Sequence, residues 1–278
     1  SQKMMLKLLV IGGFFHLKEQ ISFESAEPQI GEGGGGCTQV IEQVEQYRSQ
    51  GFTAFGIVDR DILLSKSANE ENAEKADQYE TLFWQTDDNQ FLATQIFGEH
   101  IHVLKRWELE SYLLKPEALQ ARIKSKKLSQ NVMSVDEVTQ ALIDNEDNFI
   151  TVTILSTYAA NMLGKNSSDK FEVQNHGEVL ETKVKNQLGI NGSNDFYIHY
   201  DKIKLFAEQE DNISIRWDKL SRLLDAKRVL YRFEKNNMFN GIFKDMESER
   251  GDLADFIKNK PLIDTELIDF IDHILESA

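Results

Sequence analysis

The chain has 278 residues, 41% hydrophobic and 28% charged, enough apolar material for one large domain or two smaller ones. Its 46 acidic residues outnumber its 31 basic ones, and the net charge of −15 excludes a general nucleic-acid coating protein because the overall field repels phosphate. The single cysteine, Cys37, excludes an internal disulfide framework, and no apolar run reaches the length of a membrane span. We therefore expect a soluble, cytoplasmic protein that does not bind a membrane.

The first part of the chain predicts a parallel βαβ unit. Residues 6–11 and 21–24 are short apolar or alternating runs typical of strands. The glycine-rich segment Gly31–Gly36 predicts a loop, and apolar residues at helical spacing predict a helix over Cys37–Gln50. The continuous apolar run Phe52–Val58 predicts a strand buried on both faces. A strand, a glycine loop, a helix and a second buried strand indicate a parallel sheet.

The rest of the chain predicts mainly helices. Residues 65–80 are polar, as in a solvated loop or an exposed helix, whereas Phe91–Phe97 and Ile101–Leu104 are strand candidates. Pro116 takes a favoured early position in a helix. We expect an α/β fold with a Rossmann-like parallel-sheet core in residues 1–115, an α-helical insertion in 116–210 and a helical C-terminal part in 211–278.

Two pairs of acidic residues follow predicted strands. Asp59 and Asp61 come directly after a buried strand, where ligands bind in open parallel sheets, and a divalent cation relieves the repulsion between such carboxylates. Glu108 and Glu110 follow another predicted strand among apolar residues, where an unpaired carboxylate is costly to desolvate. The four acids are typical of a Mg²⁺ or Mn²⁺ site, with helix capping and solvent-facing acids as the simpler alternatives.

Taken together, these motifs resemble a known group of nucleases. The turn and helix at Gly33–Val44, the strand ending in Asp-x-Asp at Phe55–Asp61 and the Glu-x-Glu-Ser-Tyr-Leu-Leu motif within Arg106–Leu114 resemble toprim domains of the overcoming-lysogenization-defect type. The resemblance is closest to the toprim effectors of PARIS phage-defence systems. Asp225–Leu230 is similar to the Gly-Lys-x-Val-Leu segment that contributes a functional lysine in that family.

This resemblance implies a toprim-like core and a metal-dependent endonuclease that acts on DNA or RNA with Mg²⁺ or Mn²⁺. It implies metal ligation by Asp59 and Asp61, completed by Glu110 and by Glu108, while Lys227 would contact the scissile phosphate. The implied partners are an AAA-type or ABC-type ATPase that holds and releases this effector of phage defence, and a phage trigger or inhibitor protein. The chain has no nucleotide-binding loop of its own. Whether it forms a homodimer is left open by the sequence.

The first motif departs from the family pattern. The family places a catalytic, metal-binding glutamate after its first strand as Glu-Gly-x-x-Asp, and Ile11 stands near that point here. Glu24 is the better candidate, but the stretch between it and Gly33 is too short for the expected helix and strand. A catalytically degenerate toprim subunit that serves as a protein-binding module is therefore the alternative.

Basic residues in the C-terminal part predict a nucleic-acid contact. Arg216, Lys219, Lys227 and Arg228 recur along what we predict to be one helix face and could follow a phosphate backbone. The same spacing is also common on a solvated helix surface.

Two other interpretations of the site residues rank lower. A phosphatase of the Asp-x-Asp type usually continues with Thr or Val where this chain has Leu63, and its motif lies on the first strand. Cys37, beside the glycine turn, is interpreted as a small packed residue rather than a nucleophile, because no order of cysteine, histidine and then aspartate or asparagine is evident.

Overall fold

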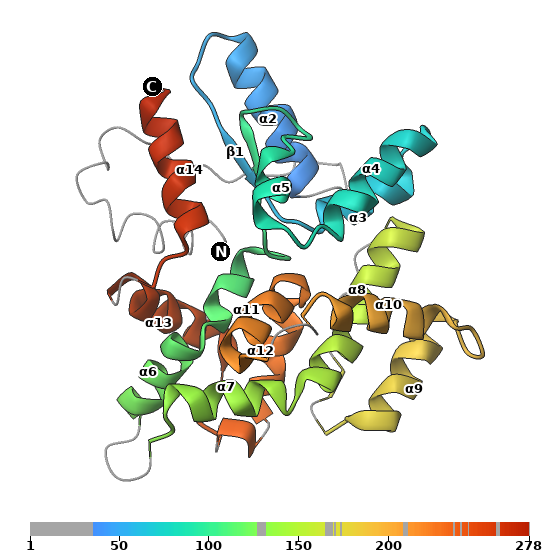
Figure 1. Ribbon diagram of the computed structural model, residues 1–278, viewed down its shortest axis with the longest axis vertical. Coiled ribbons are helices and arrows are strands. Elements are labelled where there is room, and N and C mark those ends of the chain that lie inside the picture. Colours follow the sequence, from blue (N-terminus) through green and yellow to red (C-terminus); the bar gives the residue numbers. More distant parts are fainter. Residues whose placement is uncertain are drawn as a thin grey trace.

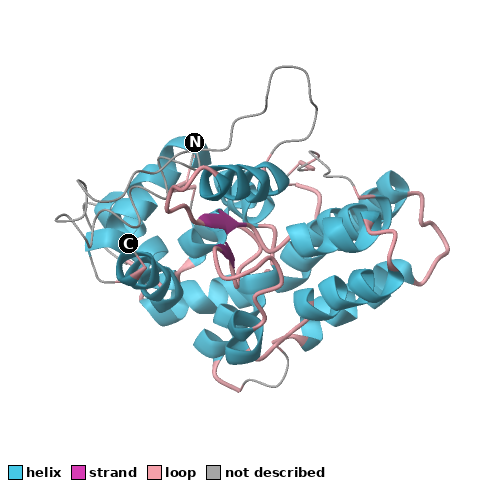
Figure 2. Cartoon of the chain, turned by 90° about the horizontal axis from the view of Figure 1, so that it is seen from above, coloured by secondary structure: helices cyan, strands magenta, loops and turns pink. Residues whose placement is uncertain are grey.

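The computed structural model describes a largely helical chain with two short parallel strands among its helices (Figure 2). The strands predicted over 6–11 and 21–24 lie outside the described residues. None of the described helices is long and apolar enough to cross a membrane. The described residues are 36–126, 132–164, 169, 171–172, 174–207, 211–235, 237–239, 241–243, 245–259 and 262–277.

The sheet consists of β1 (Gly56–Val58) and β2 (Ile101–Val103), which pair in parallel with their first residues opposite one another. Helix α2 (Cys37–Ser49) packs against β1 so closely that a Cβ at Gly56 would lie 2.7 Å from Cγ1 of Val40. The predicted helix and a parallel sheet are confirmed. Among the described residues the partner of β1 is β2, whereas the strand predicted before the helix lies outside them. The strand predicted over 52–58 is shorter than expected, because its partner β2 spans three residues.

Three helices form the crossover between the two strands. The strand predicted over Phe91–Phe97 is wrong, because the Asp87 side chain accepts a hydrogen bond from the Gln90 N–H at 2.9 Å and caps a helix there instead. The polar segment 65–80 is divided between the first two of these helices rather than forming a loop. The crossover helices are α3 (Ile62–Asn69), α4 (Ala73–Phe83) and α5 (Asp88–Ala93).

The remainder of the described chain is helical. Pro116 opens α6 as predicted. After β2 come the 3₁₀ helix η2 (Leu109–Leu114), α6 (Pro116–Lys126), α7 (Val135–Ile143), α8 (Glu146–Leu163), α9 (Gly177–Leu188), α10 (Asp195–Leu205), α11 (Ile213–Leu223), α12 (Ala226–Lys235), η3 (Asn237–Phe239), α13 (Met246–Asn259) and α14 (Thr265–Glu276).

The last helix returns to the sheet. Figure 1 shows α14 beside α2, β1 and α5, whereas α6, α7 and α11–α13 lie together in the lower part of the view. The ring of Phe270 on α14 stacks on that of His102 in β2, with centroids 4.6 Å apart, and also meets the edge of Phe55. The C-terminal helix therefore contributes directly to the environment of the strands.

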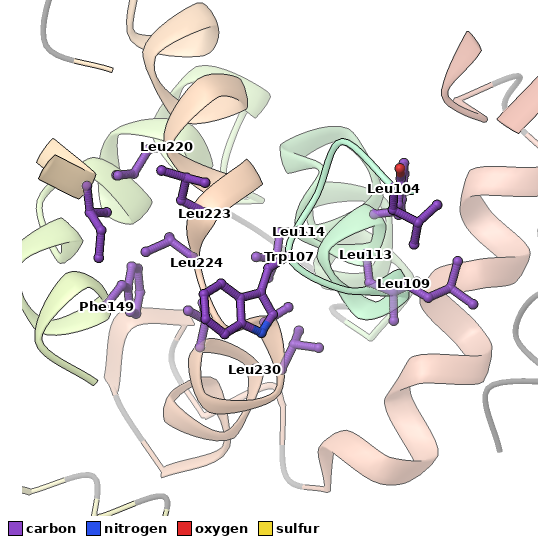
Figure 3. Packing of buried hydrophobic residues seen from close by; sticks show 14 of the residues in the cluster. Leu104, Trp107, Leu109, Leu113, Leu114, Phe149, Leu220, Leu223, Leu224 and Leu230 are labelled. Atoms are coloured by element: carbon purple, nitrogen blue, oxygen red, sulfur yellow. The ribbon is translucent and has the colours of Figure 1, made fainter. Parts of the chain in front are cut away.

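A continuous apolar core joins the sheet to the helical part. Trp107, between β2 and η2, is 3% exposed, and its backbone N–H donates to the carbonyl of Arg222 near the end of α11. Figure 3 shows its indole among labelled apolar side chains of η2, α8, α11 and α12. The segment after β2 is thus held firmly between the sheet and the C-terminal helices.

Arg60, which lies between Asp59 and Asp61 in the sequence, is buried and stabilises the fold. Its guanidinium donates to the carbonyls of Phe83, Gln85 and Lys105 at 2.6–3.0 Å. It also lies over the ring of Phe91, 4.3 Å from the centroid. These contacts tie the turn after β1 to the ends of α4 and β2, so the orientation of both aspartates depends on Arg60.

Replacing Arg60 with methionine should lower the free energy of unfolding by about 3 kcal/mol, because one buried and two partly buried carbonyls would lose their donors. The expected fall in melting temperature is roughly 6–10 °C, measured by circular dichroism. Lys75→Met is the matched control, since Lys75 is exposed on α4 and its loss should shift the melting temperature by less than about 1 °C. Equal melting temperatures for the two variants would contradict the scaffold role.

Candidate functional site

The carboxyl end of β1 places the first acidic pair. Asp59 follows the last strand residue, and Asp61 occupies the position before the first residue of α3. The Asp59 N–H donates to Sγ of Cys37, the first residue of α2, at 3.3 Å. The Cys37 sulfur and one carboxylate oxygen of each aspartate all lie within 4.8 Å of one another. The two aspartates therefore form a cluster at the sheet edge where the sequence predicts a ligand site.

The second acidic pair lies against the first. The backbone N–H of Leu109, which opens η2, donates to Oδ1 of Asp59 at 3.2 Å. Glu108 and Glu110 flank Leu109 and are buried, with 4% and 3% of their surfaces exposed. This hydrogen bond joins the turn after β1 to the start of η2, so it brings the segments of the two predicted acidic pairs together.

Lys227 joins the same cluster from α12. Its ammonium is hydrogen-bonded to Oε2 of Glu108 and lies 3.6 Å from Oε2 of Glu110, while its backbone N–H donates to Oε1 of Glu108 at 2.8 Å. The Glu108 carboxylate thus caps the start of α12 and pairs with its lysine. Five of the predicted catalytic and metal-binding residues meet here: Asp59, Asp61, Glu108, Glu110 and Lys227.

The site carries more negative than positive charge in a poorly solvated setting. Burial, and then the charge of Asp59, raises the pKa of Asp61 to about 8. Burial, and then Asp225, holds the pKa of Glu108 well above its usual range. Burial opposes the charged form of Lys227, but Glu108 and Glu110 outweigh it and raise the pKa of the ammonium. One lysine does not neutralise the acids around it.

Glu110 offers an acceptor atom that the described residues leave unused. Its Oε2 atom is buried and makes no hydrogen bond within the described part of the chain, while Oε1 accepts from Nη1 of Arg250 at 3.4 Å. The ammonium of Lys227 lies 3.6 Å from this oxygen, which is an ion-pair distance but too long for a hydrogen bond, so the oxygen can still accept a donor or a cation. Among the described residues, the side chains that bring ligand atoms within 4.8 Å of one another are Cys37, Asp59 and Asp61, and Glu108 and Glu110 lie outside that group. The two aspartates supply the oxygen donors that a hard divalent cation such as Mg²⁺ or Mn²⁺ prefers.

Cys37 does not belong to that donor set. Burial, followed by the charges of Asp59 and Asp61, raises the pKa of its thiol, so the sulfur stays protonated. A protonated thiol is a poor ligand for a hard cation, and its sulfur instead accepts the N–H of Asp59. Cys37 is a packed residue that positions the turn after β1.

Sequence reasoning missed two charged neighbours of the site. Asp225 accepts the N–H of Arg228 at 3.0 Å at the start of α12 and acts electrostatically on Glu108. Arg250, on α13, reaches Glu110 from a segment in which no motif marks it. Asp225 lies inside the segment used to find Lys227, so its position could have been noticed, whereas Arg250 has no sequence signal.

The prediction that the four basic residues lie on one helix face is wrong. Helix α11 ends at Leu223, and an extended Leu224 precedes α12. Arg216 pairs with Glu146, and Arg228 is buried against Asp225. Of these four basic residues, Lys227 contacts the acidic cluster, while Lys219 lies half-buried on α11.

Glu24, the candidate for the first-motif glutamate, lies outside the described residues. Comparison of the chain with protein-family models, with curated proteins and with solved structures gave no match.

Proposed function

We propose that the chain is a metal-dependent endonuclease that hydrolyses phosphodiester bonds of DNA or RNA. One observation carries the proposal: at the carboxyl end of a parallel strand, a hydrogen bond joins the segments of two acidic pairs, and the second pair contacts Lys227. Clusters of carboxylates with a cation partner are the usual means of holding divalent metal ions next to a phosphate.

In this proposal Asp59 and Asp61, whose carboxylate oxygens lie together, hold Mg²⁺ or Mn²⁺. Glu110, which has a buried oxygen without a hydrogen-bond donor, and Glu108 would complete the ligand set, although both lie outside the group formed by the two aspartates. The bound ion supplies polarisation of the phosphate and a more acidic water molecule. Lys227, whose side chain is 40% exposed, keeps its ammonium accessible from solvent while it contacts Glu108. That ammonium binds a phosphate oxygen and stabilises the negative charge that develops on it.

The motif resemblance extends the proposal to the biological setting. We propose that the nuclease is a cytoplasmic effector of a phage-defence system and that a partner ATPase holds and releases it. A phage protein would act as trigger or inhibitor. The toprim-like identity of the core is part of the same proposal, and the two paired strands with their crossover helices are compatible with it.

A specific observation favours the second candidate, a catalytically degenerate subunit that binds another protein. The carboxylate of Glu108 is already bonded to both the backbone N–H and the ammonium of Lys227, and Glu110 is paired with Arg250. A cluster neutralised by its own cations would be a structural element rather than a metal centre.

Cleavage assays separate the two candidates. The protein, incubated with plasmid DNA and with a structured RNA, should cut at least one of them in the presence of Mg²⁺ or Mn²⁺ and neither in the presence of EDTA. Calorimetric titration with Mn²⁺ should show binding in the same buffer. Absence of both cleavage and Mn²⁺ binding at millimolar metal would leave only the degenerate subunit.

A further inference from the structure

A cavity lies at the opposite end of the strands from the acidic cluster. It has a volume of about 390 Å³ and lies where the chain enters β1 and β2, between α2 and the end of α14. That volume is within the range of about 300–1,000 Å³ typical of small-molecule sites. Its lining residues are Arg48, Gly51, Phe52, Thr53, Phe55, Glu99, His100, His273 and Ser277.

Aromatic rings form the apolar part of this cavity. Phe55 meets the rings of His100 and His273 edge to face, with centroids 5.5 and 5.7 Å apart. Phe52 is 61% exposed at the rim, and Tyr47 packs against its edge. A phenylalanine ring that stays in water at the edge of a cavity offers a stacking surface for a planar aromatic ligand.

Charged and polar groups surround these rings. Nη1 of Arg48 donates to the carbonyl of Ala54 at 3.1 Å, which holds the guanidinium 5.9 Å from the Phe55 centroid. The exposed imidazole of His273 makes no hydrogen bond within the described residues. An arginine anchored by one nitrogen and a histidine with unused nitrogens are suitable donors for a phosphate group.

A carboxylate completes the lining. Oε1 of Glu99 lies 3.2 Å from Nε2 of His100, and the Glu99 side chain is 67% exposed. This acidic group would repel a simple anion such as inorganic phosphate. A carboxylate does, however, accept hydrogen bonds from the amino group of a nucleobase. The cavity thus combines a stacking ring, phosphate donors and an acceptor for an amino group.

We propose that this cavity binds a nucleoside monophosphate with an amino-bearing base: the base stacks on Phe52, its amino group donates to Glu99, and the phosphate accepts from Arg48 and His273. The cavity shares no residue with the acidic cluster, so this site is independent of the proposed endonuclease. Ligands of parallel sheets usually bind at the carboxyl ends of the strands, and this would be a second site at their amino ends.

Calorimetric titration of the full chain in EDTA tests the site without metal and without cleavage. AMP should bind with a Kd of about 0.1–1 mM, as expected for a half-open site with a few charged contacts. Adenosine, which lacks the phosphate, should bind at least about tenfold more weakly, and ribose 5-phosphate, which lacks the base, should not bind detectably. Failure of AMP to bind, or adenosine binding as tight as AMP, would overturn the proposal.

Variants locate the site. Phe52→Ser and Arg48→Gln should each weaken AMP binding about tenfold or more. Val179→Ser removes a similarly exposed apolar side chain on α9, and Lys75→Gln removes an exposed cation on α4; both should bind AMP like the unmodified chain. Equal AMP affinity for Phe52→Ser and Val179→Ser would exclude this cavity as the site, whatever the outcome of the cleavage assays.

Discussion

Replacing Asp59 with asparagine should reduce metal-dependent cleavage by about 10²–10³-fold. The substitution keeps an oxygen that can accept the N–H of Leu109, now at 3.2 Å from Oδ1, so the contact between the two acidic segments can persist. It removes the neighbouring charge that raises the pKa of Asp61 most, and with that charge the attraction for a divalent cation. Activity should therefore fall without loss of the fold, measured as the rate of cleavage of plasmid DNA or RNA.

Two further measurements accompany that assay. Without metal and at about pH 8, where Asp61 ionises, Asp59→Asn should raise the melting temperature by a few degrees, about 2–4 °C for each kcal/mol of repulsion relieved between the two carboxylates. In calorimetry, Mn²⁺ binding should weaken strongly. Asp255→Asn, an exposed position on α13, is the matched control and should leave cleavage, metal binding and stability unchanged. Cleavage that survives Asp59→Asn would exclude the proposed site.

The sequence was most informative where a local pattern decides the structure. The helix beginning at Cys37 and the parallel pairing of the strands follow from apolar spacing and from a continuous buried run. Asp59 and the backbone of Leu109 meet because the segments that follow adjacent parallel strands leave the same edge of the sheet. Lys227 was found by a motif resemblance and not by spacing, since it comes from a helix far along the chain.

The sequence-based predictions failed where competing local signals, or contacts between residues far apart in the chain, determine the structure. Phe91 has the apolar neighbours of a strand residue, but the Asp87 cap and the stacking of Arg60 on its ring select a short helix. Arg228 has the spacing of a surface cation, yet Asp225 three residues earlier draws it into the interior. The partnership of Glu110 with Arg250 depends on how α13 packs, which no periodicity predicts.

Without metal, the protein should become less stable as pH rises from 6.5 to 8. The pKa of Asp61 is about 8 in the folded chain and about 4 in the unfolded one, so the folded state holds an extra proton between these values. The stabilising effect of that proton is fully present below about pH 4 and is lost as pH rises through the folded pKa. The slope reaches at most about 1.4 kcal/mol per pH unit, and partial hydration of the cluster reduces it.

The pH window is chosen to separate Asp61 from an opposing group. Burial lowers the pKa of His199 to about 4, which makes the protein more stable as pH rises between about 4 and 6.5 but adds little above that range. Over pH 6.5–8 the melting temperature of the metal-free protein should fall by about 3–5 °C. The raised pKa of Glu108 also makes the folded protein less stable as pH rises. Asp61→Asn should therefore reduce the fall in melting temperature, whereas Asp255→Asn should not.

Added metal should reverse the fall in stability with rising pH, because a metal ion can bind Asp61 only after the carboxyl group of Asp61 has lost its proton. The rise in melting temperature caused by Mn²⁺ should be larger at pH 8 than at pH 6.5 in the unmodified chain, and this difference should disappear in Asp61→Asn. Equal stabilisation by Mn²⁺ at both pH values would exclude Asp61 as a ligand. A pH-dependent melting temperature that Mn²⁺ does not alter at all would instead identify a buried cluster closed by Lys227 and Arg250, as in the degenerate subunit.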